Sequence, residues 1–116
     1  MNGGLASVDE LVKGILHGLA TRPVKDCEIL LFPAYVHLIN VVNLVEGVDI
    51  AVGSQDIDIR SGGSVTGAVS AHMVRDAGCE VFLCGHSERR THFGETNEII
   101  AEKFEVGLAA GLTPIL

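Results

Sequence analysis

Four short runs of apolar residues alternate along this chain with four longer stretches in which apolar residues recur every three or four positions. The runs occupy residues 29–32, 48–53, 81–84 and 112–116, and the longer stretches occupy 7–20, 36–46, 66–77 and 97–110. The first pattern is typical of buried strands and the second of helices with one apolar face. Parallel strands joined by helices are the common way to bury such runs, so the order predicts an α/β fold with a parallel sheet.

Local signals add expectations about individual elements. Ser7 and Glu10 are spaced as a capping box at the start of the first helix, and Lys13 falls on that helix's solvent face. The run 29–32 predicts a strand buried on both faces. The third helix is expected to end at Gly78.

Composition and charge restrict the possible partners. The 116 residues include 8 Lys and Arg against 15 Asp and Glu, a net charge of −7, which argues against a nucleic-acid or anionic-membrane partner. No apolar run approaches the roughly 20 residues that span a bilayer, and no leader-like segment opens the chain. Cys27, Cys79 and Cys84 are too few for a disulfide framework, so we expect a reducing, cytoplasmic setting. The length by itself suits one small domain.

A long polar connection follows the second run. Residues 54–66 include Ser61-Gly62-Gly63-Ser64 and have no apolar period. Connections of this length are often functional, although a plain surface linker fits the composition equally well.

The segment Cys84-Gly85-His86-Ser87-Glu88-Arg89-Arg90 directly follows the third run. The carboxyl ends of parallel strands are where α/β folds place their active sites, and Gly85 permits a sharp turn there. An imidazole at this position can serve as an acid or base, as a neutral hydrogen-bond donor to an oxyanion, or as a metal ligand. His86 can equally serve only to satisfy the loop backbone.

Metal binding and serine catalysis find little support in the spacing. Cys84, His86 and His92 match no standard zinc pattern, and Cys84 continues an apolar run as a small buried side chain would. We therefore expect no metal. Ser87 lacks the setting of a serine nucleophile. Three other histidines are expected on the surface of helices: His17, His37 and His72.

Residues 85–95, Gly-His-Ser-Glu-Arg-Arg-Thr-His-Phe-Gly-Glu, resemble the signature of the triosephosphate isomerase family. Three further segments resemble its V-G-A-Q-N, S-G-A-F/Y-T-G and G-L-T-P-V-L motifs, namely 52–56, 61–67 and 111–116. Met1-Asn2-Gly3 is similar to the end of its opening N-W-K-M-N-G. These matches run in family order along the whole chain.

The resemblance implies an eight-stranded (β/α) barrel, of which residues 1–116 form about half, from the first helix through the fifth strand. It implies interconversion of glyceraldehyde 3-phosphate and dihydroxyacetone phosphate through an enediol(ate), without a cofactor, in glycolysis and gluconeogenesis. His86 matches the family's neutral, electrophilic histidine. Glu88 matches a supporting glutamate that pairs with the catalytic lysine, and Asn2 lies at the edge of the substrate-binding segment.

The resemblance also implies a homodimer in the complete enzyme. The residues that match the dimer contact are Gln55, Thr66, Gly67 and Arg89. Four nearby residues depart from the family pattern: Asp56 replaces asparagine, Ser64 replaces alanine, Val65 replaces an aromatic residue and Ala68 replaces glutamate.

The family's catalytic lysine would fall just before Met1, and its base, lid and phosphate-binding segment would fall after Leu116. On this interpretation the chain is a fragment that is inactive alone. Two alternatives remain at this point: a small flavodoxin-like module that binds a ligand or partner without catalysis, and another phosphosugar-binding barrel enzyme. Such a module is expected to be monomeric, whereas half a barrel exposes unpaired strand edges and associates.

Overall fold

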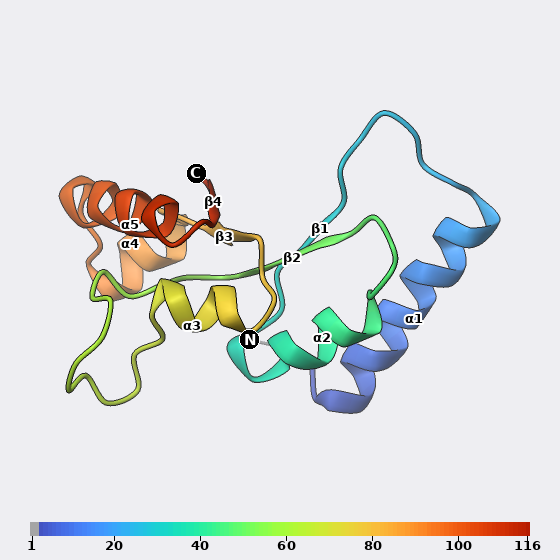
Figure 1. The fold of residues 1–116 in the computed structure, drawn as a ribbon, viewed down its shortest axis with the longest axis horizontal. Coiled ribbons are helices and arrows are strands. Elements are labelled where there is room, and N and C mark those ends of the chain that lie inside the picture. The colour runs from blue at the N-terminus through green and yellow to red at the C-terminus, as the bar shows by residue number, and fades with distance from the viewer. Residues whose placement is uncertain (1–2) are drawn as a thin grey trace.

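A computed structural model describes residues 3–116, so Asn2 lies outside the described residues. In chain order the elements are α1 (Leu5–Thr21), β1 (Leu30–Leu31), the 3-10 helix η1 (Tyr35–His37), α2 (Leu38–Leu44), β2 (Ala51–Ser54), α3 (Ala71–Asp76), β3 (Val81–Leu83), α4 (Ser87–Phe93), α5 (Asn97–Ala109) and β4 (Thr113–Ile115) (Figure 1). The alternation predicted from the sequence is confirmed.

The four strands form one parallel sheet in the order β1-β2-β3-β4. Leu30 lies opposite Ala51 in the first pair, and Gly53 lies opposite Val81 in the second. Because every strand runs in the same direction, all four carboxyl ends meet at one edge of the sheet, and the segment after β3 begins there.

Helices cover the sheet and exclude water from its apolar side chains. α2 packs against β2, α1 packs against α2, and α5 packs against β4. In Figure 1, α1 and α2 gather at one end of the molecule and α4 and α5 at the other. The core includes Phe82, Ile57, Val41, Val74 and Leu112, all of which are buried. None of the helices within residues 3–116 is long and apolar enough to cross a membrane.

Strand β1 differs from the prediction of a strand buried on both faces. Leu30 and Leu31 are only partly buried. β1 lies at the edge of the sheet and pairs with β2 alone, so one side of the strand has no neighbouring strand among the described residues to cover it.

The predicted capping box on the first helix is wrong. α1 begins at Leu5, with Gly4 as its N-cap and no capping side chain. Ser7 already lies within the first turn, and its hydroxyl donates to the carbonyl of Gly4 at 2.9 Å instead of accepting from an amide. Lys13 lies on the exposed side of α1, as predicted, 3.7 Å from a carboxylate oxygen of Asp9.

The third helix starts at Ala71 and not near residue 66. Ser70 is its N-cap, since the hydroxyl accepts from the backbone N–H of Met73 at 3.3 Å. The preceding residues, 55–70, form a loop that extends away from the sheet in Figure 1, and Gly67 within it has a φ of +88°. Gly78 follows α3 with a φ of +91°, which agrees with the expected stop.

The helical histidines lie mostly where predicted. His17 and His72 are exposed. His37 is instead partly buried, and its Nε2 lies 3.2 Å from the carbonyl oxygen of Gly3, in the segment before α1.

Two helical glycines give opposite expectations for substitution by alanine. A Cβ at Gly107 in α5 would lie 2.5 Å from Cζ of the buried Phe82 ring, whereas a Cβ at Gly14 in α1 would meet nothing within 4 Å. Overpacking costs about 1–3 kcal/mol, while replacing a helical glycine gains about 0.5–1 kcal/mol. We therefore expect Gly107→Ala to lower the unfolding temperature and Gly14→Ala to raise it, measured by circular dichroism. Equal shifts would contradict the close packing of α5 on β3.

Candidate active site

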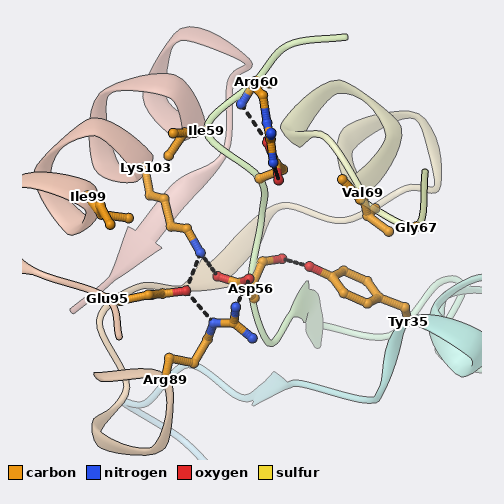
Figure 2. Close-up of a pocket in the computed structure, with 12 residues that line it drawn as sticks. Tyr35, Asp56, Ile59, Arg60, Gly67, Val69, Arg89, Glu95, Ile99 and Lys103 are labelled. Carbon is orange, nitrogen blue, oxygen red and sulfur yellow. Dashed lines mark hydrogen bonds and ion pairs between the residues drawn. The ribbon is translucent and has the colours of Figure 1, made fainter. Parts of the chain in front are cut away.

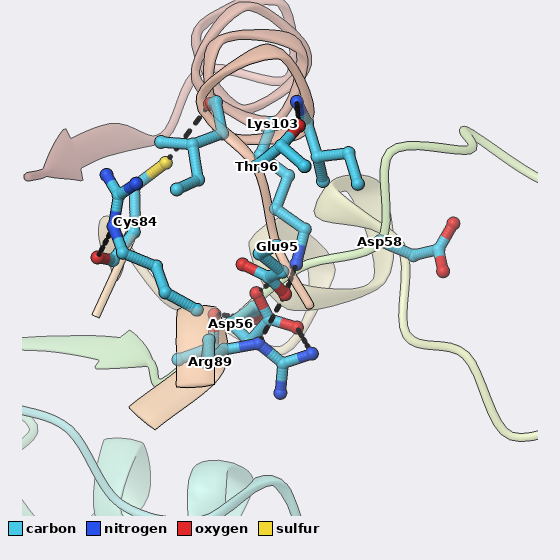
Figure 3. Close-up of polar contacts among 12 residues, drawn as sticks. Asp56, Asp58, Cys84, Arg89, Glu95, Thr96 and Lys103 are labelled. Carbon is cyan, nitrogen blue, oxygen red and sulfur yellow. Dashed lines mark hydrogen bonds and ion pairs between the residues drawn. The ribbon is translucent and has the colours of Figure 1, made fainter. Parts of the chain in front are cut away.

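The turn between β3 and α4 brings His86 to the carboxyl edge of the sheet. Cys84 is buried, as predicted, and its thiol donates to the carbonyl of Ile100 in α5 at 3.4 Å (Figure 3). Gly85 has a φ of +76°, and a Cβ there would lie 3.1 Å from Cγ2 of Ile100. The turn therefore requires glycine both for its conformation and for its close approach to α5.

His86 forms the N-cap of α4 through its own ring. Its Nδ1 accepts a hydrogen bond from the backbone N–H of Glu88 at 3.2 Å. An accepting Nδ1 carries no proton, so the neutral ring carries its proton on Nε2. The side chain is 48% exposed, which leaves this donor accessible at the edge of the sheet.

Glu88 lies next to the imidazole but points largely into solvent. Its side chain is 76% exposed, and Oε2 lies 3.8 Å from Nδ1 of His86. The structure therefore brings these two residues together at one place. Within residues 3–116, no three His, Cys, Asp or Glu side chains lie close enough together to hold a metal ion.

The four residues that resemble a dimer contact do not all lie at one place. Gln55 donates from Nε2 to the carbonyl of Phe32 at 2.8 Å. Thr66 is exposed in the long loop, and Gly67 next to it lines a cavity that Arg89 also lines. Gly67 and Arg89 are thus brought to one cavity, while Gln55 is attached to the end of β1.

Four charged side chains form an ion cluster that the sequence analysis missed: Asp56, Arg89, Glu95 and Lys103. Glu95 and Lys103 are buried, and Asp56 and Arg89 are partly buried. Nζ of Lys103 donates to Asp56 Oδ1 at 2.5 Å and to Glu95 Oε1 at 2.6 Å. Arg89 donates from Nε to the same Glu95 oxygen at 2.5 Å, and its Nη2 lies 3.0 Å from Asp56 Oδ2 (Figure 2). Each carboxylate therefore contacts both cations.

The ion cluster connects four parts of the fold. Asp56 lies two residues after the end of β2, Arg89 is on α4, Glu95 lies between α4 and α5, and Lys103 is on α5. One sequence signal could have revealed it. Lys103 occupies the helix position three residues after the buried Ile100 and four before the buried Gly107, so it lies on the helix face that is expected to be apolar.

A cavity of about 350 Å³ borders the ion cluster on the side of the long loop. Tyr35 lines it and donates from its hydroxyl to the backbone carbonyl of Asp56 at 2.5 Å (Figure 2). Burial raises the pKa of Tyr35, and the nearby Asp56 carboxylate adds to the effect, so this phenol remains a donor. Asp56 is thus held both from its side chain and from its backbone.

The two carboxylates of the ion cluster have pKa values shifted in opposite directions. Burial raises the pKa of Asp56 and outweighs its hydrogen bond from Lys103. Burial also acts to raise the pKa of Glu95, but hydrogen bonds from Lys103 and Arg89 outweigh it, and the pKa falls below its usual range. Burial therefore dominates at Asp56, whereas the hydrogen bonds from the two cations dominate at Glu95.

These shifts predict unequal effects of amide substitution. The pKa of Glu95 is lowered in the folded state, so Glu95 stabilises the fold above its ordinary pKa, and this stability is lost as the pH falls through the lowered value. The pKa of Asp56 is raised in the folded state, so its protonation stabilises the fold at acid pH, and this stability is lost as the pH rises through the raised value. At pH 7 we expect Glu95→Gln to lower the free energy of unfolding by about 3–5 kcal/mol, because it leaves the buried Lys103 ammonium underpaired, and Asp56→Asn to lower it less. Urea denaturation between pH 4 and 7.5 measures both. Equal costs at pH 7 would contradict this assignment.

The sequence of this chain matches one family of known proteins. The family model described as triosephosphate isomerase matches residues 1–116. A protein named triosephosphate isomerase from Roseiflexus sp. (strain RS-1) is 49% identical over 107 residues, which is 92% of this chain and 41% of the relative. A protein of that name from Magnetococcus marinus is 39% identical over 116 residues, which is all of this chain and 45% of the relative.

The chain thus spans less than half the length of these curated relatives. Its four parallel strands are half the number in an eight-stranded barrel, which agrees with the barrel that the sequence motifs imply. The flavodoxin-like alternative is wrong, because the matching family is a barrel family. The family model covers the whole chain, and the chain therefore belongs to the triosephosphate isomerase family.

Proposed function

We propose that the complete polypeptide containing this chain interconverts glyceraldehyde 3-phosphate and dihydroxyacetone phosphate, and that His86 is its electrophile. One observation carries the assignment of His86. The Glu88 N–H donates to Nδ1, which makes Nε2 the proton donor of a neutral ring. The names of the relatives support the reaction.

The proposed chemistry moves a proton between adjacent carbons of the substrate. As a base removes a proton from one carbon, the electron pair forms an enediolate and the carbonyl oxygen becomes negative. The Nε2–H of His86 donates to that oxygen and stabilises the developing charge. This family is the standard example of a neutral imidazole in that role. The oxidation and reduction are internal to the substrate, so the reaction calls for no cofactor.

Glu88 and Asn2 have supporting roles in this proposal. The Glu88 carboxylate is exposed beside His86, where it can pair with the lysine that the family motif places just before Met1. Asn2 belongs to the same motif and would lie at the substrate. The base and the phosphate-binding segment come from the part of the family sequence beyond Leu116.

We further propose that the complete protein is a cytoplasmic homodimer that binds neither nucleic acid nor membrane. Gln55, Thr66, Gly67 and Arg89 would form the contact, with the long loop of one subunit against the other. Three exposed apolar side chains on nearby elements support this surface: Val36, Met73 and Phe93. The Arg89 guanidinium also lies over the Phe93 ring, with Cζ of Arg89 4.2 Å from the ring centroid, which would present both side chains to a partner.

The role of His86 is tested in the complete polypeptide by His86→Gln. We expect kcat to fall roughly 100- to 10,000-fold with a much smaller change in KM, since the lost donor acts mainly on the transition state. His92→Gln is the matched control, because His92 is an exposed residue of the same helix, α4, and should leave both constants unchanged. An unchanged kcat in His86→Gln would remove this residue from the mechanism.

Comparing the complete polypeptide with the isolated 116-residue chain tests the proposed dimer and the proposed location of the other catalytic groups. The complete polypeptide is expected to sediment as a dimer in analytical ultracentrifugation and to isomerise triose phosphates. The isolated chain is expected to show no turnover in a coupled assay, because the proposed lysine, base and phosphate-binding segment are absent from it. Turnover by the pure chain would contradict the assignment of those groups to the remainder.

A further inference from the structure

Arg90 holds the backbone on both sides of His86. Its side-chain Nε donates to the carbonyl of Gly85 at 2.9 Å, and its backbone N–H donates to the carbonyl of His86 at 3.2 Å. The second bond is an ordinary helical bond. The first is a contact from a side chain to the residue directly before the imidazole, and nothing in the proposed chemistry accounts for it.

These two bonds fix the backbone from which the imidazole projects. Each peptide unit is planar, so a held carbonyl fixes the whole plane to which it belongs. The plane containing the Gly85 carbonyl ends at the Cα of His86, and the plane containing the His86 carbonyl begins there. With both planes held, His86 keeps its φ of −51° and ψ of 140°, and the direction of its Cα–Cβ bond is fixed.

Arg90 is itself anchored to α5. Its Nη1 donates to Oδ1 of Asn97, the first residue of that helix, at 2.7 Å. The anchor matters because glycine has the widest conformational freedom of any residue type, so the backbone of the turn at Gly85 would otherwise adopt several conformations. Nε and Nη1 of one guanidinium lie in a rigid plane, so Arg90 can bind two separate acceptors at once. All three donors of a lysine lie on one nitrogen, so a lysine cannot place them at two separate points as Nε and Nη1 do.

We propose that Arg90 and Asn97 form a positioning pair that sets the direction of the His86 imidazole toward the substrate. The proposal rests on the function assigned to His86 above. Neither residue touches the reacting atoms, since both act through the backbone of residues 85 and 86.

The test uses Arg90→Ala and Arg90→Lys in the complete polypeptide. We expect kcat to fall about 10- to 100-fold with KM changed less than about threefold, because a small misplacement of a catalytic group costs rate more than binding. Arg75→Ala is the matched control. Arg75 also donates from its guanidinium to a backbone carbonyl, that of Cys79 at 3.0 Å, but before the amino end of β3. Its loss should leave kcat unchanged.

Asn97 provides a second variant that keeps the guanidinium in place. Asn97→Ala removes only the anchor and should lower kcat in the same direction as Arg90→Ala. Asn97→Asp keeps an acceptor for Nη1 and should retain kcat. Full activity in both Arg90→Ala and Asn97→Ala, or an equal loss in Arg75→Ala, would overturn the positioning role.

A double-mutant cycle separates this inference from the proposed function. If Arg90 acts through His86, Arg90→Ala should lower kcat by less than about threefold when added to His86→Gln, because the group it positions is already gone. If the two losses multiply, the positioning role is wrong while the function of His86 stands. If His86→Gln alone has no effect on kcat, the proposed function fails and this inference fails with it.

Discussion

The buried ammonium group of Lys103 constrains how the described elements can be arranged around the site. Its residue is only 5% exposed, and a buried cation is tolerated only where anions and hydrogen bonds replace the lost water. Asp56 and Glu95 supply those anions, and Arg89 balances the second negative charge. The segment after β2, helix α4, the turn before α5 and the middle of α5 therefore meet at one point.

Helix α4 contacts both the ion cluster and the turn that carries His86. Arg89 and Arg90 are consecutive, so on a helix with 3.6 residues per turn they point about 100° apart. Arg89 enters the ion cluster, while Arg90 contacts Gly85 and Asn97. One side of the helix is thus fixed by charge and the other holds the turn that carries His86. The geometry of the imidazole follows from both.

Local periodicity predicted the positions of the strands and of α5 well, because the apolar residues that mark each of these elements are close together in the sequence. His86 could be found for the same reason, since it follows an apolar run and a glycine. The ion cluster could not be found this way. Asp56 is 47 residues from Lys103 along the chain, and no local pattern records that they meet. The start of α3 was misplaced because Ser70, the actual N-cap, lies inside a stretch whose apolar spacing already looks helical.

The error at β1 has a different origin. Residues 29–32 carry the continuous apolar pattern of a strand with cover on both faces, yet Leu30 and Leu31 are only partly buried in this chain. A sequence records the environment of the whole protein in which it is used. Relatives of this chain are more than twice its length, and a closed barrel would place another strand beside β1. The pattern is therefore the one expected of an interior barrel strand, and the partial burial of β1 agrees with a chain that spans less than half the length of those relatives.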